Sequence, residues 1–97
     1  MPQKNFIILY PDSLGANAVG CFGADAAYTP NLDRLAQNGV QFKNCTSQNP
    51  VCQPSRASLL TGKYVSCHGV FDNGIKSYPE GHVTFQQMLK NNGYYTA

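Results

Sequence analysis

The chain has 97 residues, of which 42% are hydrophobic and 12% are charged, so its composition is that of a folded domain with a modest core and not of a disordered segment. The net charge of +2 is small and the seven Lys and Arg are scattered, which excludes a basic nucleic-acid-binding face. No stretch contains the roughly 20 consecutive apolar residues of a membrane helix. We therefore expect neither a nucleic-acid partner nor a membrane span.

The amino-terminal apolar run and the cysteines bear on the cellular compartment. Residues 6–10 are too few for a secretion leader, so we expect a cytoplasmic protein or, if a leader has been removed, a periplasmic or secreted one. The cysteines form no Cys-x-x-Cys pair and no zinc-finger spacing with His, which argues against structural zinc. We expect thiols that are not joined in disulfides, with Cys21, Cys45 and Cys67 as small buried residues.

Strand and helix patterns alternate in the first half of the chain. Residues 6–10 form a continuous apolar run, which predicts a strand buried on both faces. Thr29 is a candidate cap for a helix that begins at Pro30 and ends at Gly39. Residues 40–43 alternate apolar and polar side chains, which predicts a second strand.

The run around Cys52 carries the clearest chemistry in the sequence. Pro54 suits the first position of a helix, because its missing N–H needs no partner there, and we expect a helix over residues 55–61 that stops at Gly62. Cys52 then precedes this helix, where unpaired N–H groups and the helix dipole favour negative charge. Arg56 follows one turn later. The run therefore predicts a site for an anionic group beside a reactive side chain.

The last third of the chain predicts loops, one helix and one strand. Residues 64–79 contain glycines and a proline and are expected to be irregular. Residues 84–87, Thr-Phe-Gln-Gln, are a capping-box pattern that opens a helix ended by Gly93. Residues 94–97 begin another strand. The order of elements predicts an α/β fold with a partly parallel sheet.

Residues 52–56, Cys-Gln-Pro-Ser-Arg, resemble the Cys-x-Pro-Ser-Arg motif of the type I, formylglycine-dependent sulfatases of the alkaline-phosphatase-like superfamily. The resemblance implies an alkaline-phosphatase-like α/β sheet flanked by helices. It also implies that residues 1–97 are the amino-terminal part of a longer catalytic domain, with a catalytic Lys and His and further metal ligands beyond Ala97. Further segments that resemble the family, in its order, are residues 5–12, 20–23, 29–36, 61–64, 68–70 and 89–97.

The resemblance implies a hydrolase that cleaves sulfuric esters of small molecules or carbohydrates. A maturation enzyme would oxidise Cys52 to formylglycine, whose aldehyde hydrate attacks sulfur in a covalent mechanism. The hydrate would also bind a divalent metal, usually Ca²⁺ in the family, with Mg²⁺ or Mn²⁺ as alternatives. Arg56 would hold the hydrate and neutralise charge, a role suited to a fixed guanidinium.

Three further residues are candidates for the site. Asp12 follows the first predicted strand, at the edge where open α/β sheets bind ligands, and its carboxylate suits calcium or magnesium. Many sulfatases have a second aspartate next to it; this chain has Ser13, whose hydroxyl is a candidate metal ligand, directly or through water. Asn73 resembles an asparagine that reaches the substrate in relatives similar to choline sulfatase and phosphonate monoester hydrolase. Asn73-Gly74 is equally a favoured turn dipeptide, and both interpretations stay open.

Two alternative functions remain open on the sequence alone. Phosphonate monoester and phosphodiester hydrolases of the same superfamily share the formylglycine motif, and a catalytically silent chain would lack the downstream Lys, His and metal ligands. Lys63 is expected at the surface after the helix, and His82 has no motif around it. His68 is expected to pack or to form hydrogen bonds within a loop.

Overall fold

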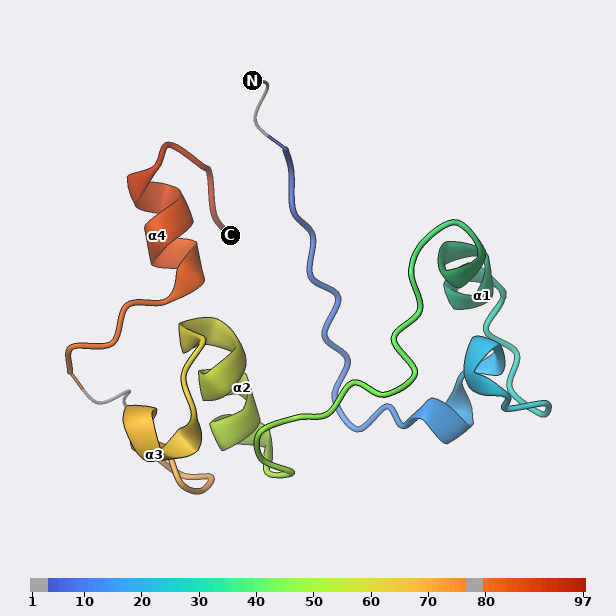
Figure 1. Cartoon of the computed structure of the whole chain (residues 1–97), viewed down its shortest axis with the longest axis horizontal. Coiled ribbons are helices and arrows are strands. Elements are labelled where there is room, and N and C mark those ends of the chain that lie inside the picture. The colour runs from blue at the N-terminus through green and yellow to red at the C-terminus, as the bar shows by residue number, and fades with distance from the viewer. Residues whose placement is uncertain (1–3, 77–79) are drawn as a thin grey trace. The chain divides into compact units, whose positions relative to one another are not determined.

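The computed structural model describes residues 4–76 and 80–97, and the chain divides into two compact units, Met1–Asn44 and Cys45–Ala97. All regular secondary structure in the described residues is helical (Figure 1), and no helix among them is long and apolar enough to cross a bilayer. The elements are the 3-10 helices η1 (Ala16–Ala18) and η2 (Gly20–Phe22) and the α-helices α1 (Pro30–Gln37), α2 (Cys52–Thr61), α3 (Val65–His68) and α4 (Phe85–Asn91).

In the first unit, a network of hydrogen bonds joins α1 to η2. Asp33 Oδ1 accepts hydrogen bonds from the backbone N–H of Cys21 at 2.7 Å and from the hydroxyl of Thr29 at 3.1 Å. The Thr29 hydroxyl oxygen also accepts from the backbone N–H of Gly20 at 2.9 Å. The helix starts at Pro30 as predicted, but capping by the Thr29 side chain is wrong, because this side chain bonds to η2 and Asp33 and makes no capping bond.

In the second unit, α2 packs against α3. Helix α2 buries Pro54, Ala57 and Ser58 on one face and ends at Gly62, whose φ of 66° lies in the left-handed region that glycine adopts without strain. The helix begins at Cys52, three residues before the predicted range 55–61, so the predictions that Pro54 takes the first helical position and that Cys52 precedes the helix are wrong. Pro54 is tolerated as the third residue, because first-turn N–H groups have no partner within a helix.

The segment predicted to be irregular contains α3, and its residues 77–79 lie outside the described residues. Helix α4 follows Thr84, whose hydroxyl accepts a hydrogen bond from the backbone N–H of Gln87 at 3.3 Å. That bond confirms the predicted cap, which satisfies a first-turn donor.

The three predicted strands are not formed in the described part of the chain. Residues 4–10 run as an extended trace (Figure 1), and residues 40–43 and 94–97 also lack regular structure. An extended segment becomes a strand only through a ladder of hydrogen bonds to a neighbour, and the described residues contain no such ladder. The α/β sheet therefore stays a prediction.

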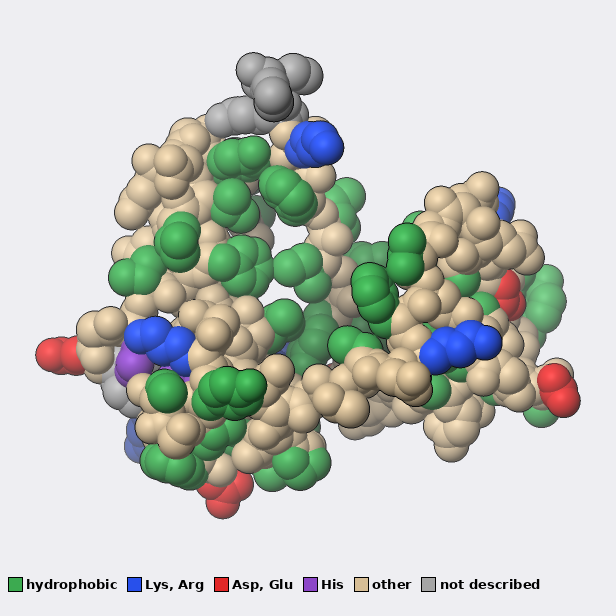
Figure 2. Space-filling model, viewed as in Figure 1, with side chains coloured by type: hydrophobic (Ala, Val, Ile, Leu, Met, Phe, Trp, Pro, Cys, Tyr) green, Lys and Arg blue, Asp and Glu red, His purple; other side chains and the backbone are tan. Residues whose placement is uncertain are grey.

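The segments predicted as strands keep their apolar side chains exposed, and hydrophobic side chains are visible across the surface in Figure 2. Ile7, Leu9 and Val40 are exposed to 85%, 74% and 79%. Val19, by contrast, is buried. Soluble proteins rarely expose this much apolar surface. Such a surface is typical of a face that another segment or protein covers.

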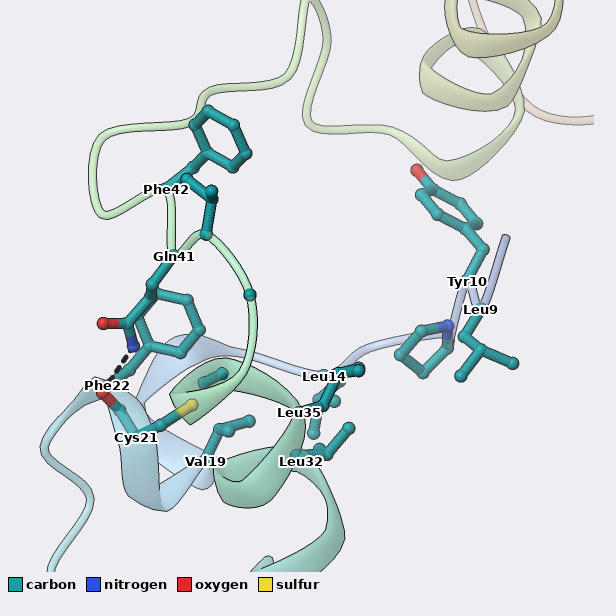
Figure 3. Close-up of a pocket in the computed structure, with 14 residues that line it drawn as sticks. Leu9, Tyr10, Leu14, Val19, Cys21, Phe22, Leu32, Leu35, Gln41 and Phe42 are labelled. Carbon is teal, nitrogen blue, oxygen red and sulfur yellow. Dashed lines mark hydrogen bonds between the residues drawn. The ribbon is translucent and has the colours of Figure 1, made fainter. Parts of the chain in front are cut away.

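The first unit also contains an apolar hollow of about 950 Å³ (Figure 3). In the close-up, Leu32 and Leu35 of α1 line it together with Val19, and the Gln41 amide donates to the carbonyl of Cys21 at its rim. None of the predicted site residues is among its lining residues, so the hollow has the character of an unfilled core and not of a catalytic pocket. Its other lining residues are Leu9, Tyr10, Pro11, Leu14, Cys21, Phe22, Ala36, Gly39, Val40 and Phe42.

Candidate active site

The candidate site is built on the first turn of α2. Cys52 is the first residue of this helix and its side chain is exposed. Val51 occupies the N-cap position in an extended conformation, and its carbonyl accepts the first helical hydrogen bond, from Ser55 N at 3.0 Å. The preceding loop is held by Asn49, whose side-chain oxygen accepts from Val51 N at 2.8 Å. Cys52 therefore stands at an ordered helix start and is accessible.

A residue distant in sequence caps this helix. Asn73 Oδ1 accepts a hydrogen bond from the backbone N–H of Gln53 at 2.9 Å, across 20 residues of sequence. The bond brings Asn73, the predicted substrate-binding residue, to the first turn of α2. It satisfies a first-turn donor as a local N-cap side chain would.

The side chain of Gln53 fastens the loop that carries Asn73. Its Oε1 accepts hydrogen bonds from the backbone N–H groups of Gly74 at 2.8 Å and Ile75 at 3.2 Å. Its Nε2 donates to the carbonyl of Ile75. We call this set of bonds between Gln53 and residues 73–75 the Gln53 clamp. The turn interpretation of Asn73-Gly74 also has support, because Gly74 has a φ of 93°.

The backbone donors at this helix start differ from the expectation. The N–H of Gln53 is bonded to Asn73, Pro54 has none, and the N–H of Ser55 is bonded to Val51. The prediction of unpaired N–H groups is therefore wrong for Gln53 and Ser55. The predicted anion site beside Cys52 then depends more on side-chain donors.

Two side chains can supply those donors. Because Oδ1 of Asn73 acts as an acceptor, the other end of its amide is the NH₂ group, with two hydrogens to donate. Arg56, half-buried, lies four residues after Cys52, and residues so spaced share one face of a helix. Its planar guanidinium carries five N–H donors. The second unit thus brings Asn73 to the helix end that bears Cys52, and Arg56 lies about one turn further along α2.

Asp12 and Ser13 belong to the first unit. Ser13 has a φ of 55°, a left-handed conformation that a serine adopts at a cost. Calcium takes six to eight oxygen ligands, and magnesium six. In the ranges 4–76 and 80–97, no group of three or more His, Cys, Asp or Glu could hold a metal ion. These residues do not fit a metal on their own, so metal binding by Asp12, Ser13 and Cys52 stays a prediction.

His68 forms a hydrogen bond to α2 outside the candidate site. The side chain is fully buried, and its Nε2 lies 2.9 Å from Ser58 Oγ, while its Nδ1 accepts the backbone N–H of Val70 at 3.1 Å. The prediction that His68 packs and forms hydrogen bonds is confirmed, but its placement in a loop is wrong, because His68 is the last residue of α3. Lys63 Nζ donates to His82 Nδ1 at an exposed position, as expected for residues outside the site.

Sequence reasoning missed Gln53 and misjudged two thiols. Gln53 fills the variable position of the motif, and only its place beside Cys52 pointed to it. Cys45 and Cys67 are exposed, so the expectation of buried thiols is wrong for both; each lies at the surface of a unit with little core. None of the four cysteines, all within the described residues, is joined in a disulfide.

Comparison with known proteins gives consistent matches. A sequence model of the sulfatase family matches residues 4–97. The chain is 37% identical over 105 residues to a steryl-sulfatase of Rattus norvegicus, covering 98% of this chain and 18% of that protein. It is 38% identical over 102 residues to an N-acetylglucosamine-6-O-sulfatase of Bacteroides thetaiotaomicron, covering 99% of this chain and 18% of that protein. It is 40% identical over 95 residues to an ulvan-active sulfatase of Formosa agariphila, covering 98% of this chain and 18% of that protein.

No solved structure matches the chain. The chain spans about a fifth of the length of these curated relatives, because each match covers 18% of the relative. The family model, in contrast, matches all but the first three residues of the chain. The chain therefore belongs to the sulfatase family.

Proposed function

We propose that the full-length protein is a sulfatase, a sulfuric ester hydrolase that acts through Cys52 after its conversion to formylglycine. One observation carries the proposal: the bond from Gln53 N to Asn73 Oδ1 brings a second predicted site residue to the helix start that bears Cys52. An isolated cysteine at a helix start would be weak support. A cysteine, an arginine and an oriented amide at one helix end are a site for an anion beside a nucleophile.

The residues of this chain have distinct tasks in that reaction. Formylglycine at position 52, in its hydrated form, supplies the nucleophile for the sulfur atom. The Asn73 NH₂ group donates a hydrogen bond to an oxygen of the sulfate group. Arg56 offsets the negative charge, which is most effective where water is excluded. The exposed position of Cys52 gives substrate access to the reacting atom.

The family generally uses a divalent metal, and we assign Asp12 to its coordination here. The carboxylate of Asp12 is a hard oxygen ligand, which suits Ca²⁺ and also Mg²⁺ or Mn²⁺. The hydroxyl of Ser13 is a second candidate ligand. The remaining ligands are assigned to other parts of the full-length protein.

The family implies an alkaline-phosphatase-like fold, in which we place residues 1–97 as the amino-terminal part of the catalytic domain. The exposure of Ile7, Leu9 and Val40 supports this arrangement, because these side chains lie in segments predicted as strands of its sheet. The rest of the domain would cover them.

The substrate is a sulfate ester of a small molecule or a carbohydrate. The names of the relatives cover steryl esters, an amino sugar and the polysaccharide ulvan, so the class is wider than any one of them. The shared feature is the sulfate group, which the residues around Cys52 bind. Residues that bind the alcohol belong to other parts of the full-length protein.

The test combines mass spectrometry with hydrolysis assays on the full-length protein. The tryptic peptide containing Cys52 should carry an aldehyde in place of the thiol, and an aryl sulfate should be hydrolysed. Cys52→Ala should abolish both, and Cys45→Ala, at an exposed thiol outside the site, should change neither. Faster turnover of a phosphodiester or phosphonate monoester than of the sulfate would overturn the assignment in favour of that activity. No turnover of any of these esters by converted protein would favour a catalytically silent chain.

A further inference from the structure

The loop over residues 73–75 is bonded to α2 by one residue, Gln53, through its side chain and its backbone N–H. Gln53 uses both ends of its amide: the oxygen accepts from Gly74 N and Ile75 N, and the nitrogen donates to the carbonyl of Ile75. Its backbone N–H donates to Asn73 Oδ1. A single residue therefore makes four hydrogen bonds to three consecutive residues about 20 positions away.

These bonds fix the orientation of the Asn73 amide as well as its position. With Oδ1 held by Gln53 N, the NH₂ group is the end that remains for a ligand. Asn73, Gly74 and Asp72 are all exposed, so little packing holds the loop. The bond from Asn73 N to Asp72 Oδ1 at 2.7 Å is local and does not tie the loop to α2. The Gln53 side chain makes three of the four described bonds between this exposed loop and the first turn of α2, and the fourth runs from the Gln53 backbone N–H to Asn73 Oδ1.

We propose that Gln53 is a positioning residue for sulfate ester hydrolysis, which holds Asn73 so that its NH₂ group faces the sulfate group bound beside Cys52. The proposal rests on the proposed function. Gln53 does not touch the substrate; it acts through Asn73. An apolar side chain of the same length supplies neither the acceptor nor the donor that Gly74 and Ile75 require. Only the bond from the backbone N–H of residue 53 to Asn73 Oδ1 then remains, so the loop and the Asn73 amide are held less firmly.

The experiment is a double-mutant cycle in the full-length protein, with Gln53→Met, Asn73→Ala and their combination. Because residue 53 adjoins Cys52, conversion of Cys52 is measured by mass spectrometry in each variant, and rates are normalised to converted protein. Gln53→Met should lower kcat/KM for an aryl sulfate by about 10- to 100-fold, the range for losing one hydrogen bond to a charged group. In the Asn73→Ala background, Gln53→Met should lower kcat/KM by less than about threefold, because the two residues act as one unit.

Two controls separate positioning from general damage. Gln87→Met, at an exposed position on α4, makes the same chemical change elsewhere and should leave kcat/KM unaltered. Amide hydrogen exchange should accelerate at Gly74 and Ile75 in Gln53→Met and not in Gln87→Met, because only the former loses the acceptor of those N–H groups. Gln53→Asn, which is one methylene shorter, replaces Gln53→Met in the cycle if the latter does not fold.

Equal losses from Gln53→Met in both backgrounds would overturn the proposal, since they would show a role independent of Asn73. Unchanged kcat/KM or unchanged exchange at Gly74 and Ile75 would overturn it as well. If converted protein hydrolyses no sulfate ester, the proposed function fails. In that case amide exchange at Gly74 and Ile75 alone decides whether Gln53 positions the loop. The failure of the proposed function and the failure of the positioning proposal are therefore distinguishable.

Discussion

Ser58 and His68 form a buried hydrogen bond, 2.9 Å long, between the middle of α2 and the end of α3. The second ring nitrogen of His68 accepts the backbone N–H of Val70 at 3.1 Å, so Nδ1 carries no proton and the hydrogen of the neutral ring is on Nε2. His68 Nε2 therefore donates to Ser58 Oγ. This hydrogen bond joins α2 to the segment that leads into the loop over residues 73–75.

We expect His68→Phe to lower the free energy of unfolding of the full-length protein by about 2–5 kcal/mol, because the Ser58 hydroxyl and the Val70 N–H each lose a buried partner. Chemical denaturation monitored by circular dichroism measures the change. His82→Phe is the matched control: His82 meets Lys63 in an exposed bond, and its loss should cost less than about 0.5 kcal/mol. Equal effects at both histidines would contradict a special role for the buried pair.

Gly62 gives a second stability prediction. Its φ of 66° ends α2 in the left-handed region, and a Cβ added there would meet nothing within 4 Å. The cost of Gly62→Ala is therefore a backbone cost alone, about 1–2 kcal/mol. Thermal unfolding should show a lower midpoint for Gly62→Ala than for Gly62→Asn, because asparagine tolerates this conformation better. A midpoint for Gly62→Ala equal to that of the unchanged protein would refute the backbone argument.

The sequence predicted the helices well because their signals are local. Pro30 at a helix start, Gly62 at a helix end and the Thr84 cap each act within one turn, and all three helices occur. The hydroxyl of Thr29 was misassigned because its partners, Gly20 and Asp33, were not evident from the capping pattern. A side chain with several possible partners is decided by tertiary contacts.

The site was predicted in part, for a related reason. The motif identified Cys52 and Arg56 as candidates; Asn73 has both a bond to Gln53 at the start of α2 and a glycine turn after it, so its two interpretations are both supported. The Gln53 clamp had no sequence signal, because its bonds run to backbone groups that every residue carries. Strands and a metal site need several distant segments together, so no local pattern fixes them.

Arg56 provides a test of the anion site. Arg56→Lys keeps one positive charge and removes the planar set of donors, so we expect kcat/KM for an aryl sulfate to fall by about 100-fold in converted full-length protein. Arg34→Lys, an exposed change in α1 where Arg34 meets Asn31, should have no effect on turnover. An Arg56→Lys enzyme with normal turnover would show that charge alone suffices at this position.

Asp12 provides the test of metal binding. A divalent ion held by Asp12 loses a charged ligand in Asp12→Asn, so the purified full-length protein should retain far less metal, against about one ion per chain in the unchanged protein. Plasma emission spectrometry counts the ions and identifies Ca²⁺, Mg²⁺ or Mn²⁺. Asp25→Asn, at an exposed carboxylate outside the site, should leave the content unchanged.

The same count of bound metal ions distinguishes the role of Asp12 from that of Ser13. Ser13→Ala removes only a neutral hydroxyl, so metal content should persist with weaker affinity in competition with a chelator. Full metal content in Asp12→Asn would contradict the assignment of Asp12, whatever the activity. Loss in Ser13→Ala as large as in Asp12→Asn would instead make the hydroxyl an equal ligand, in the position where many sulfatases carry a second aspartate.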